Sequence, residues 1–172
     1  MYTKIRKINV ILICLVFAAF ASSCLYGDQK VVWTKADPLN YQKGAKVTVD
    51  VADGVDVNLT ELNFMKRNVK EYVQDTLAGN ENARGAYEVK VKITRYEEGN
   101  AFARFMLIGL GQMYLFGTVD VTEGTPPRIV RTGTFRKQVR LGGIFGLIAK
   151  PRDMTGKLGD AIAKGLLEKP RQ

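Results

Sequence analysis

Residues 87–94 are Tyr-Glu-Val-Lys-Val-Lys-Ile-Thr, and this stretch decides the fold class. Apolar and polar side chains alternate along its whole length, which is the period of a β-strand with one buried and one solvated face. The buried face is predicted to carry Tyr87, Val89, Val91 and Ile93. Such a face needs a second layer of structure to cover it.

The residues before this strand predict another strand and a helix. Val47, Val49 and Val51 alternate with polar residues over 46–51, which favours a half-buried strand. Asn58 or Thr60 is placed to cap a helix that has an acidic residue in its first turn. Steps of three and four residues then define its buried face, which ends before Gly79-Asn80: Leu62, Met65, Val69, Tyr72, Val73 and Leu77.

The residues after it predict a hairpin and a last helix. The apolar run 102–116 is interpreted as a buried strand rather than a membrane-active segment, because Arg104 and Gln112 interrupt it and it is short for a span. Turn residues at 122–127 join it to a strand over 129–140. Asp153 is predicted to cap the last helix, whose inner face carries Met154, Leu158, Ile162 and Leu166.

The predicted fold class follows from this order of elements. It is strand-helix-strand-strand-strand-helix, with a mixed or mostly antiparallel sheet covered on one face by two helices. The sequence therefore predicts an α+β fold built as a two-layer sandwich.

The N-terminus has the features of an export signal. Lys4, Arg6 and Lys7 precede an apolar run over residues 8–20, which is shorter than the roughly 20 residues that a membrane-spanning helix needs. Small residues follow at 21–23. This pattern predicts a signal peptide.

Two cleavage sites compete at the end of this signal. Ala19-Phe20-Ala21 fits ordinary secretory cleavage after Ala21, whereas Ala21-Ser22-Ser23-Cys24 resembles the lipobox of bacterial lipoproteins. Cys14 would be lost with the signal, which leaves Cys24 as an odd thiol and favours its lipidation. Leu25 rather than aspartate follows the cysteine, and by resemblance to the sorting rule of enteric bacteria this favours the outer membrane.

Three parts of the chain follow from this interpretation. Residues 1–23 are the lipoprotein signal peptide, 24–44 a lipid-anchored tether, and 45–172 a single α+β domain. The tether is expected to dock through Val31, Val32 and Trp33, although Trp33 has a second possible place at the lipid interface.

Charge is concentrated in the last part of the chain. The formal net charge is +9, and residues 126–172 hold 11 Lys/Arg against 3 Asp/Glu. Anionic head groups, cell-wall polymers or an acidic envelope protein are the expected partners, and the export signal argues against nucleic acid. The expected contact surface comprises Arg136, Lys137, Arg140, Ile144, Phe145, Lys150 and Arg152.

Residues with catalytic chemistry are scarce. The chain has no histidine, which removes the commonest general base and zinc ligand, and no metal or cofactor is expected. The glycine-rich stretch 141–150 lacks the spacing of a phosphate loop, so it is expected to pack under the last helix or to be exposed to a partner or membrane. Glu97 and Glu98 are adjacent at a turn and need not converge on a substrate, so no catalytic residue is predicted.

Short glycine motifs suggest a resemblance. Ala103 to Gly111 (Ala-Arg-Phe-Met-Leu-Ile-Gly-Leu-Gly), the strand ending Asp120-Val121-Thr122-Glu123-Gly124, and the loop Gly142-Gly143-Ile144-Phe145-Gly146 together resemble an uncharacterised family of bacterial lipoproteins. This resemblance covers about residues 45–168 and implies an envelope lipoprotein without assigned catalytic residues.

The functional expectation is a non-enzymatic outer-membrane lipoprotein facing the periplasm, which acts as a binding or accessory subunit of an envelope assembly or transport system. The alternative is a soluble periplasmic or secreted hydrolase that uses carboxylates, with cleavage after Ala21.

Overall fold

The computed structural model describes residues 25–26, 29–41, 43–77, 86–100, 102–103, 111–140 and 150–168. The predicted signal peptide, Cys24, the 141–149 loop and residues 104–110 of the apolar run 102–116 lie outside these residues. The helices and strands in chain order are β1 (Leu25–Tyr26), β2 (Lys30–Ala36), β3 (Ala45–Val51), α2 (Leu59–Thr76), β4 (Tyr87–Glu97), β5 (Met113–Glu123), β6 (Arg128–Arg140), α5 (Pro151–Thr155) and α6 (Leu158–Leu167).

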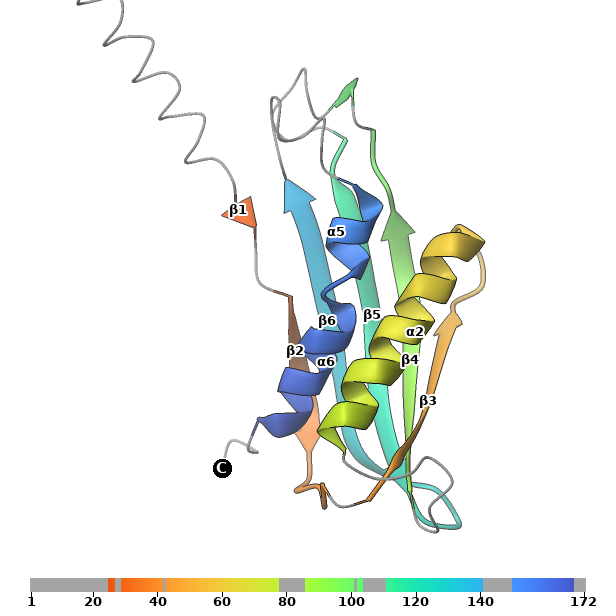
Figure 1. Cartoon of the computed structure of the whole chain (residues 1–172), viewed down its shortest axis with the longest axis vertical. Coiled ribbons are helices and arrows are strands. Elements are labelled where there is room, and N and C mark those ends of the chain that lie inside the picture. The colour runs from red at the N-terminus through yellow and green to blue at the C-terminus, as the bar shows by residue number, and fades with distance from the viewer. Residues whose placement is uncertain are drawn as a thin grey trace, which may run out of the picture.

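The strands form one mixed sheet in the order β1-β6-β5-β4-β3, and β2 also pairs with β6. β3 and β4 are parallel, while all other pairs are antiparallel. α2 joins the two parallel strands, and α2, α5 and α6 lie over the same face of the sheet (Figure 1). The predicted α+β sandwich and its order of elements are confirmed.

Alternation of apolar and polar residues gives the core as predicted. Tyr87, Val89, Val91 and Ile93 are buried on β4, and every second residue of β5 from Met113 to Val121 is buried beside them. These side chains meet the buried face of α2, whose N-terminus is capped by Asn58 through its side chain. Tyr72 was predicted to lie on that face but is 41% exposed. The buried residues of α2 are Met65, Val69 and Val73, at steps of four, and Tyr72 lies beside this line rather than on it.

The last helical segment is divided in two. Met154, Leu158, Ile162 and Leu166 are fully buried as predicted, but α5 ends at Thr155 and α6 begins after Lys157. Asp153 lies within α5, so it is not the cap of the longer helix. Gly159 allows α6 to approach α2 closely, and its N–H donates to Oδ1 of Asn68 at 2.9 Å.

The predicted tether contains a strand of the sheet. β2 lies within residues 24–44 and pairs antiparallel with β6, and both Val31 and Leu39 are buried in the core. Trp33 packs against the domain, since its Nε1 donates to the main-chain oxygen of Gly165 at 2.9 Å. The folded domain therefore begins before residue 45, which corrects the tether prediction. Val31 and Trp33 pack against the domain as predicted, whereas Val32 is 65% exposed and does not.

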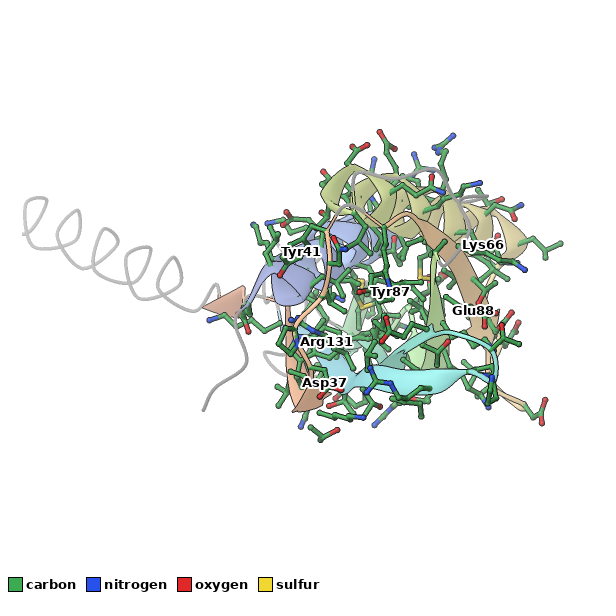
Figure 2. All side chains as sticks on the ribbon, turned by 90° about the horizontal axis from the view of Figure 1, so that it is seen from below. Asp37, Tyr41, Lys66, Tyr87, Glu88 and Arg131 are labelled. Carbon is green, nitrogen blue, oxygen red and sulfur yellow. The ribbon has the colours of Figure 1, made fainter. Side chains whose placement is uncertain are left out.

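A buried arginine ties β2 and β6 to α6. Arg131 is fully buried, and its Nη1 donates to the main-chain oxygens of Leu166 at 2.9 Å and Gly165 at 3.2 Å (Figure 2). Its Nε donates to the oxygen of Asp37 at 2.9 Å, just after β2. A cation suits this position because the main-chain oxygens at the end of a helix carry partial negative charge.

Candidate binding face

The face of the sheet opposite the helices presents a row of cations and aromatic rings. In the strand register Arg95 of β4 lies beside Phe116 of β5, Phe116 beside Arg136 of β6, and Arg136 beside Lys30 of β2. Tyr114 lies two residues from Phe116 on the same face. We call these five residues the arginine–aromatic row.

The side chains of the row are in contact. The Arg95 guanidinium lies 4.4 Å from the ring centre of Tyr114 and 5.5 Å from that of Phe116, while Arg136 lies 4.9 Å from the Phe116 ring. The two rings pack edge to face at 5.8 Å. Both rings are half-buried and both arginines are exposed, so the rings fix the guanidinium groups at the surface.

The row carries an excess of positive charge. Arg95 donates to Oε1 of Glu97 at 2.7 Å, and this hydrogen bond raises the pKa of Arg95 above its usual value. Arg136 and Lys30 take part in none of the ion pairs formed among the described residues. Fixed, exposed guanidinium groups suit carboxylate or phosphate oxygens, which they bind through paired N–H donors.

The structure separates the residues of the predicted contact surface. Arg136 is exposed on the outer face of the sheet, whereas Lys137 is only 2% exposed and points into the core. Neighbouring residues of a strand point to opposite faces, so the two cannot share one surface. Including Lys137 in the predicted contact surface was therefore wrong.

The other predicted contact residues lie elsewhere or outside the described parts. Arg152 is exposed on α5 in the helical layer, where its guanidinium lies 4.9 Å from the ring centre of Phe64, and Lys150 is exposed just before α5. Arg140 ends β6, and its side chain, like Ile144 and Phe145, is not among those described. The structure thus places Arg136 and Arg152 on opposite layers.

Arg95, Tyr114 and Phe116 were not predicted as contact residues from the sequence. Their alternation within β4 and β5 could have placed each on the outer face. The register that brings β4, β5 and β6 side by side is a property of the folded sheet, and no local pattern contains it.

The chain enters the sheet directly after Cys24. Leu25 pairs with Arg140 and Tyr26 with Val139 in an antiparallel arrangement.

The described residues provide neither a membrane-spanning helix nor a metal site. In that part of the chain no helix combines the length and the apolar character needed to cross a membrane. No group of acidic or cysteine side chains within the same residues is arranged to hold a metal ion.

Comparisons with known proteins show the fold. No family model matches the chain, and no curated protein matches its sequence. A dodecamer of a PelC variant from Paraburkholderia phytofirmans is similar in structure with a TM-score of 0.51 and 10% identity, covering 83% of this chain and 100% of the other. A second PelC dodecamer from the same organism gives a TM-score of 0.51 and 13% identity, covering 81% and 99%. At these identities the similarity concerns the fold alone.

A weaker match is a provisionally assigned lipoprotein from Caulobacter crescentus CB15. It has a TM-score of 0.35 and 18% identity, and the match covers 68% of this chain and 80% of that one.

Proposed function

We propose that this protein is a non-enzymatic lipoprotein of the bacterial cell envelope that acts as a binding or accessory subunit of an envelope assembly or transport system. The observation that carries the proposal is the N-terminal sequence: a basic segment, an apolar run and Ala-Ser-Ser-Cys, followed at once by a residue of the sheet. Cys24 bears the lipid, and Leu25 in the next position favours the outer membrane, with the domain facing the periplasm.

Lipidation would hold the domain firmly at the membrane. Each buried CH₂ group contributes about 0.8 kcal/mol, and stable attachment takes at least two acyl chains. A lipoprotein cysteine carries two or three chains, which meets this requirement. Because Leu25 pairs with Arg140, the anchor would fix the orientation of the sheet as well as its location.

The arginine–aromatic row is the proposed binding face. Its partner is an anionic envelope polymer or an acidic envelope protein, since Arg136 and Lys30 are exposed and positively charged. The PelC structures that share this fold are dodecamers, which supports a role within a larger assembly.

The carboxylates considered for the alternative hydrolase have local partners. Glu97 forms an ion pair with Arg95, and Glu98 accepts a hydrogen bond from the hydroxyl of Tyr96 at 3.1 Å. Burial raises the pKa of that tyrosine, so its hydroxyl stays protonated and can keep donating to Glu98. These contacts give both side chains a role in the folded domain without any substrate.

Membrane fractionation of a cysteine variant tests the proposal. Cys24→Ala should release the protein from the membrane fraction or leave it uncleaved, with the domain still folded. Cys14→Ala is the matched control, because that cysteine lies in the predicted signal peptide and should have no effect. A Cys24→Ala protein that is processed and fractionates like the wild type would overturn the lipid anchor.

A further inference from the structure

The edge of the sheet at β3 is open. β3 is the last strand in the sheet order, and it pairs with β4 in parallel without a register shift. None of the described residues forms a strand beside its other edge. Proteins protect such an edge with proline, a bulge, charged side chains or a covering helix; β3 has no proline and no bulge, and its charged residues are Lys46 and Asp50.

The hydrogen-bonding pattern identifies the main-chain groups at this edge. The oxygen of Gly44 accepts from the N–H of Tyr87, and the N–H of Ala52 donates to the oxygen of Ile93, both at 2.8 Å. Even-numbered residues of β3 therefore face β4. By alternation, the N–H and C=O groups of Val47, Val49 and Val51 point to the open edge.

One contact supports this assignment of the edge. The side-chain nitrogen of Gln74 on α2 donates to the main-chain oxygen of Ala45 at 3.5 Å. Because Ala45 is odd-numbered, its main-chain oxygen is expected to point away from β4, and Gln74 reaches it from α2.

A groove runs between this edge and α2. Its volume is about 520 Å³, and it is lined by Val47, Thr48, Val49, Asp50, Asn63, Lys66, Arg67 and Lys70. α2 lies alongside β3 (Figure 1), and Figure 2 shows Lys66 on the side of the helix next to that strand. The groove thus combines main-chain hydrogen-bonding groups with a helical wall.

The helical wall is basic. Lys66, Arg67 and Lys70 are exposed along it, against one lining carboxylate, that of Asp50. Residues four apart on a helix are separated by about 6 Å along its axis, and alternate residues of a strand by about 6.6 Å. Acidic side chains at every second position of an added strand would therefore match the spacing of Lys66 and Lys70.

We propose that β3 binds an extended acidic peptide segment of another protein, which adds to the sheet as a further strand. The main-chain groups of Val47, Val49 and Val51 supply its hydrogen bonds, and Lys66, Arg67 and Lys70 select its acidic side chains. This is β-strand addition, in which main-chain pairing gives affinity and side chains give specificity.

Charge disfavours a second copy of this chain as the occupant. The strand at the opposite edge, β2, carries Lys30 and Lys35 and no acidic residue, so it would bring cations toward the basic wall. Pairing of two β3 edges would place two basic walls together. An acidic partner avoids both repulsions.

Peptide binding to the full mature chain purified in detergent tests this proposal. The probe is a fluorescein-labelled, terminally blocked peptide of alternating Glu and Val, and its binding is followed by fluorescence anisotropy. We expect Lys66→Glu with Lys70→Glu to weaken binding by about tenfold or more. Lys90→Glu with Lys92→Glu, the same charge change on the exposed outer face of β4, should have a smaller effect.

A second probe tests the main-chain pairing. N-methylation removes a main-chain N–H donor without changing the charge of the peptide. Methylation of the alternate N–H groups that point toward β3 should therefore abolish binding. NMR of the unmethylated complex should shift the amide signals of Val47, Val49 and Val51 more than that of Phe116. Circular dichroism verifies that each variant is folded.

The proposal is overturned if the unmethylated peptide does not bind, if both pairs of lysine variants lose binding equally, or if binding is insensitive to methylation. Concentration-dependent self-association that Lys66→Glu with Lys70→Glu abolishes would also overturn it, because the occupant would then be a second copy.

Discussion

Arg131 donates from Nη1 to the main-chain oxygen of Leu166 at 2.9 Å, so a buried guanidinium on β6 closes the C-terminal end of α6. Tyr41 donates to the same oxygen at 3.1 Å, and Trp33 donates to the neighbouring oxygen of Gly165. Residues of β2, of the β2–β3 connection and of β6 thus meet at one helix terminus. This convergence explains why residues 30–41 belong to the folded domain.

Replacement of Arg131 should destabilise the domain. Arg131→Met leaves the oxygens of Asp37, Gly165 and Leu166 with fewer donors, and a buried polar group that loses its partner costs about 1–3 kcal/mol. Chemical denaturation measures the free energy of unfolding. Arg67→Met, an exposed arginine on α2, is the control and should change it much less. Equal effects of the two variants would contradict the role of Arg131.

Arg136 and Lys137 should respond differently to charge reversal. Arg136→Glu alters an exposed side chain of the arginine–aromatic row, so it should weaken binding to anionic partners and reduce the salt dependence of that binding. Lys137→Glu places a carboxylate at a buried position and should instead lower the melting temperature.

Two measurements separate these outcomes. Co-purification with envelope partners at low and high salt reports on binding, and thermal unfolding reports on stability. Unchanged co-purification of Arg136→Glu would contradict the proposed binding face, while an unchanged melting temperature of Lys137→Glu would contradict the buried position of Lys137.

Stability at the end of the β5–β6 hairpin should depend on pH. Hydrogen bonding to Arg128 at 2.6 Å, together with Lys43, holds the pKa of Glu123 below its ordinary value. A lowered pKa means that the stabilisation is present above the pKa of the unfolded state and is lost as pH falls through the lower, folded value.

The pH dependence is measured on the wild type and one variant. The difference in melting temperature between wild type and Glu123→Gln should be constant near pH 7 and shrink below about pH 4.5. A difference for Glu123→Gln that stays constant down to pH 3 is the contrary result.

Gly159 should not tolerate a side chain. A Cβ atom there would meet the main-chain oxygen of Asn68 at 2.5 Å, so Gly159→Ala must push α6 away from α2. We expect a loss of about 1–3 kcal/mol in the free energy of unfolding. Ser at the same position should be at least as damaging, and an alanine variant as stable as the wild type would contradict the close helix contact.

Local periodicity was sufficient to predict much of the fold. β4 and α2 carry complete patterns of two and 3.6 residues, so their buried residues follow from the sequence, apart from the misplaced Tyr72. β2 was missed because Val31, Val32 and Trp33 are consecutive apolar residues without alternation, and its place depends on pairing with β6, about 100 residues later.

The candidate sites depend even more on long-range pairing. Arg136 was predicted as a contact residue, but its neighbours Phe116 and Arg95 come from other strands through the register of the sheet. The open edge of β3 is likewise a consequence of strand order, and the same sequence in the middle of the sheet would present no free main-chain groups.

The intact mass of the mature protein extracted from membranes tests the central claim most directly. A lipid-anchored envelope protein predicts a chain that begins at Cys24 and carries two or three acyl chains, with a mass shift that Cys24→Ala removes. A chain that begins at Ser22 without any lipid would contradict the account, because the domain would then be a soluble exported protein and Cys24 would have no anchoring role.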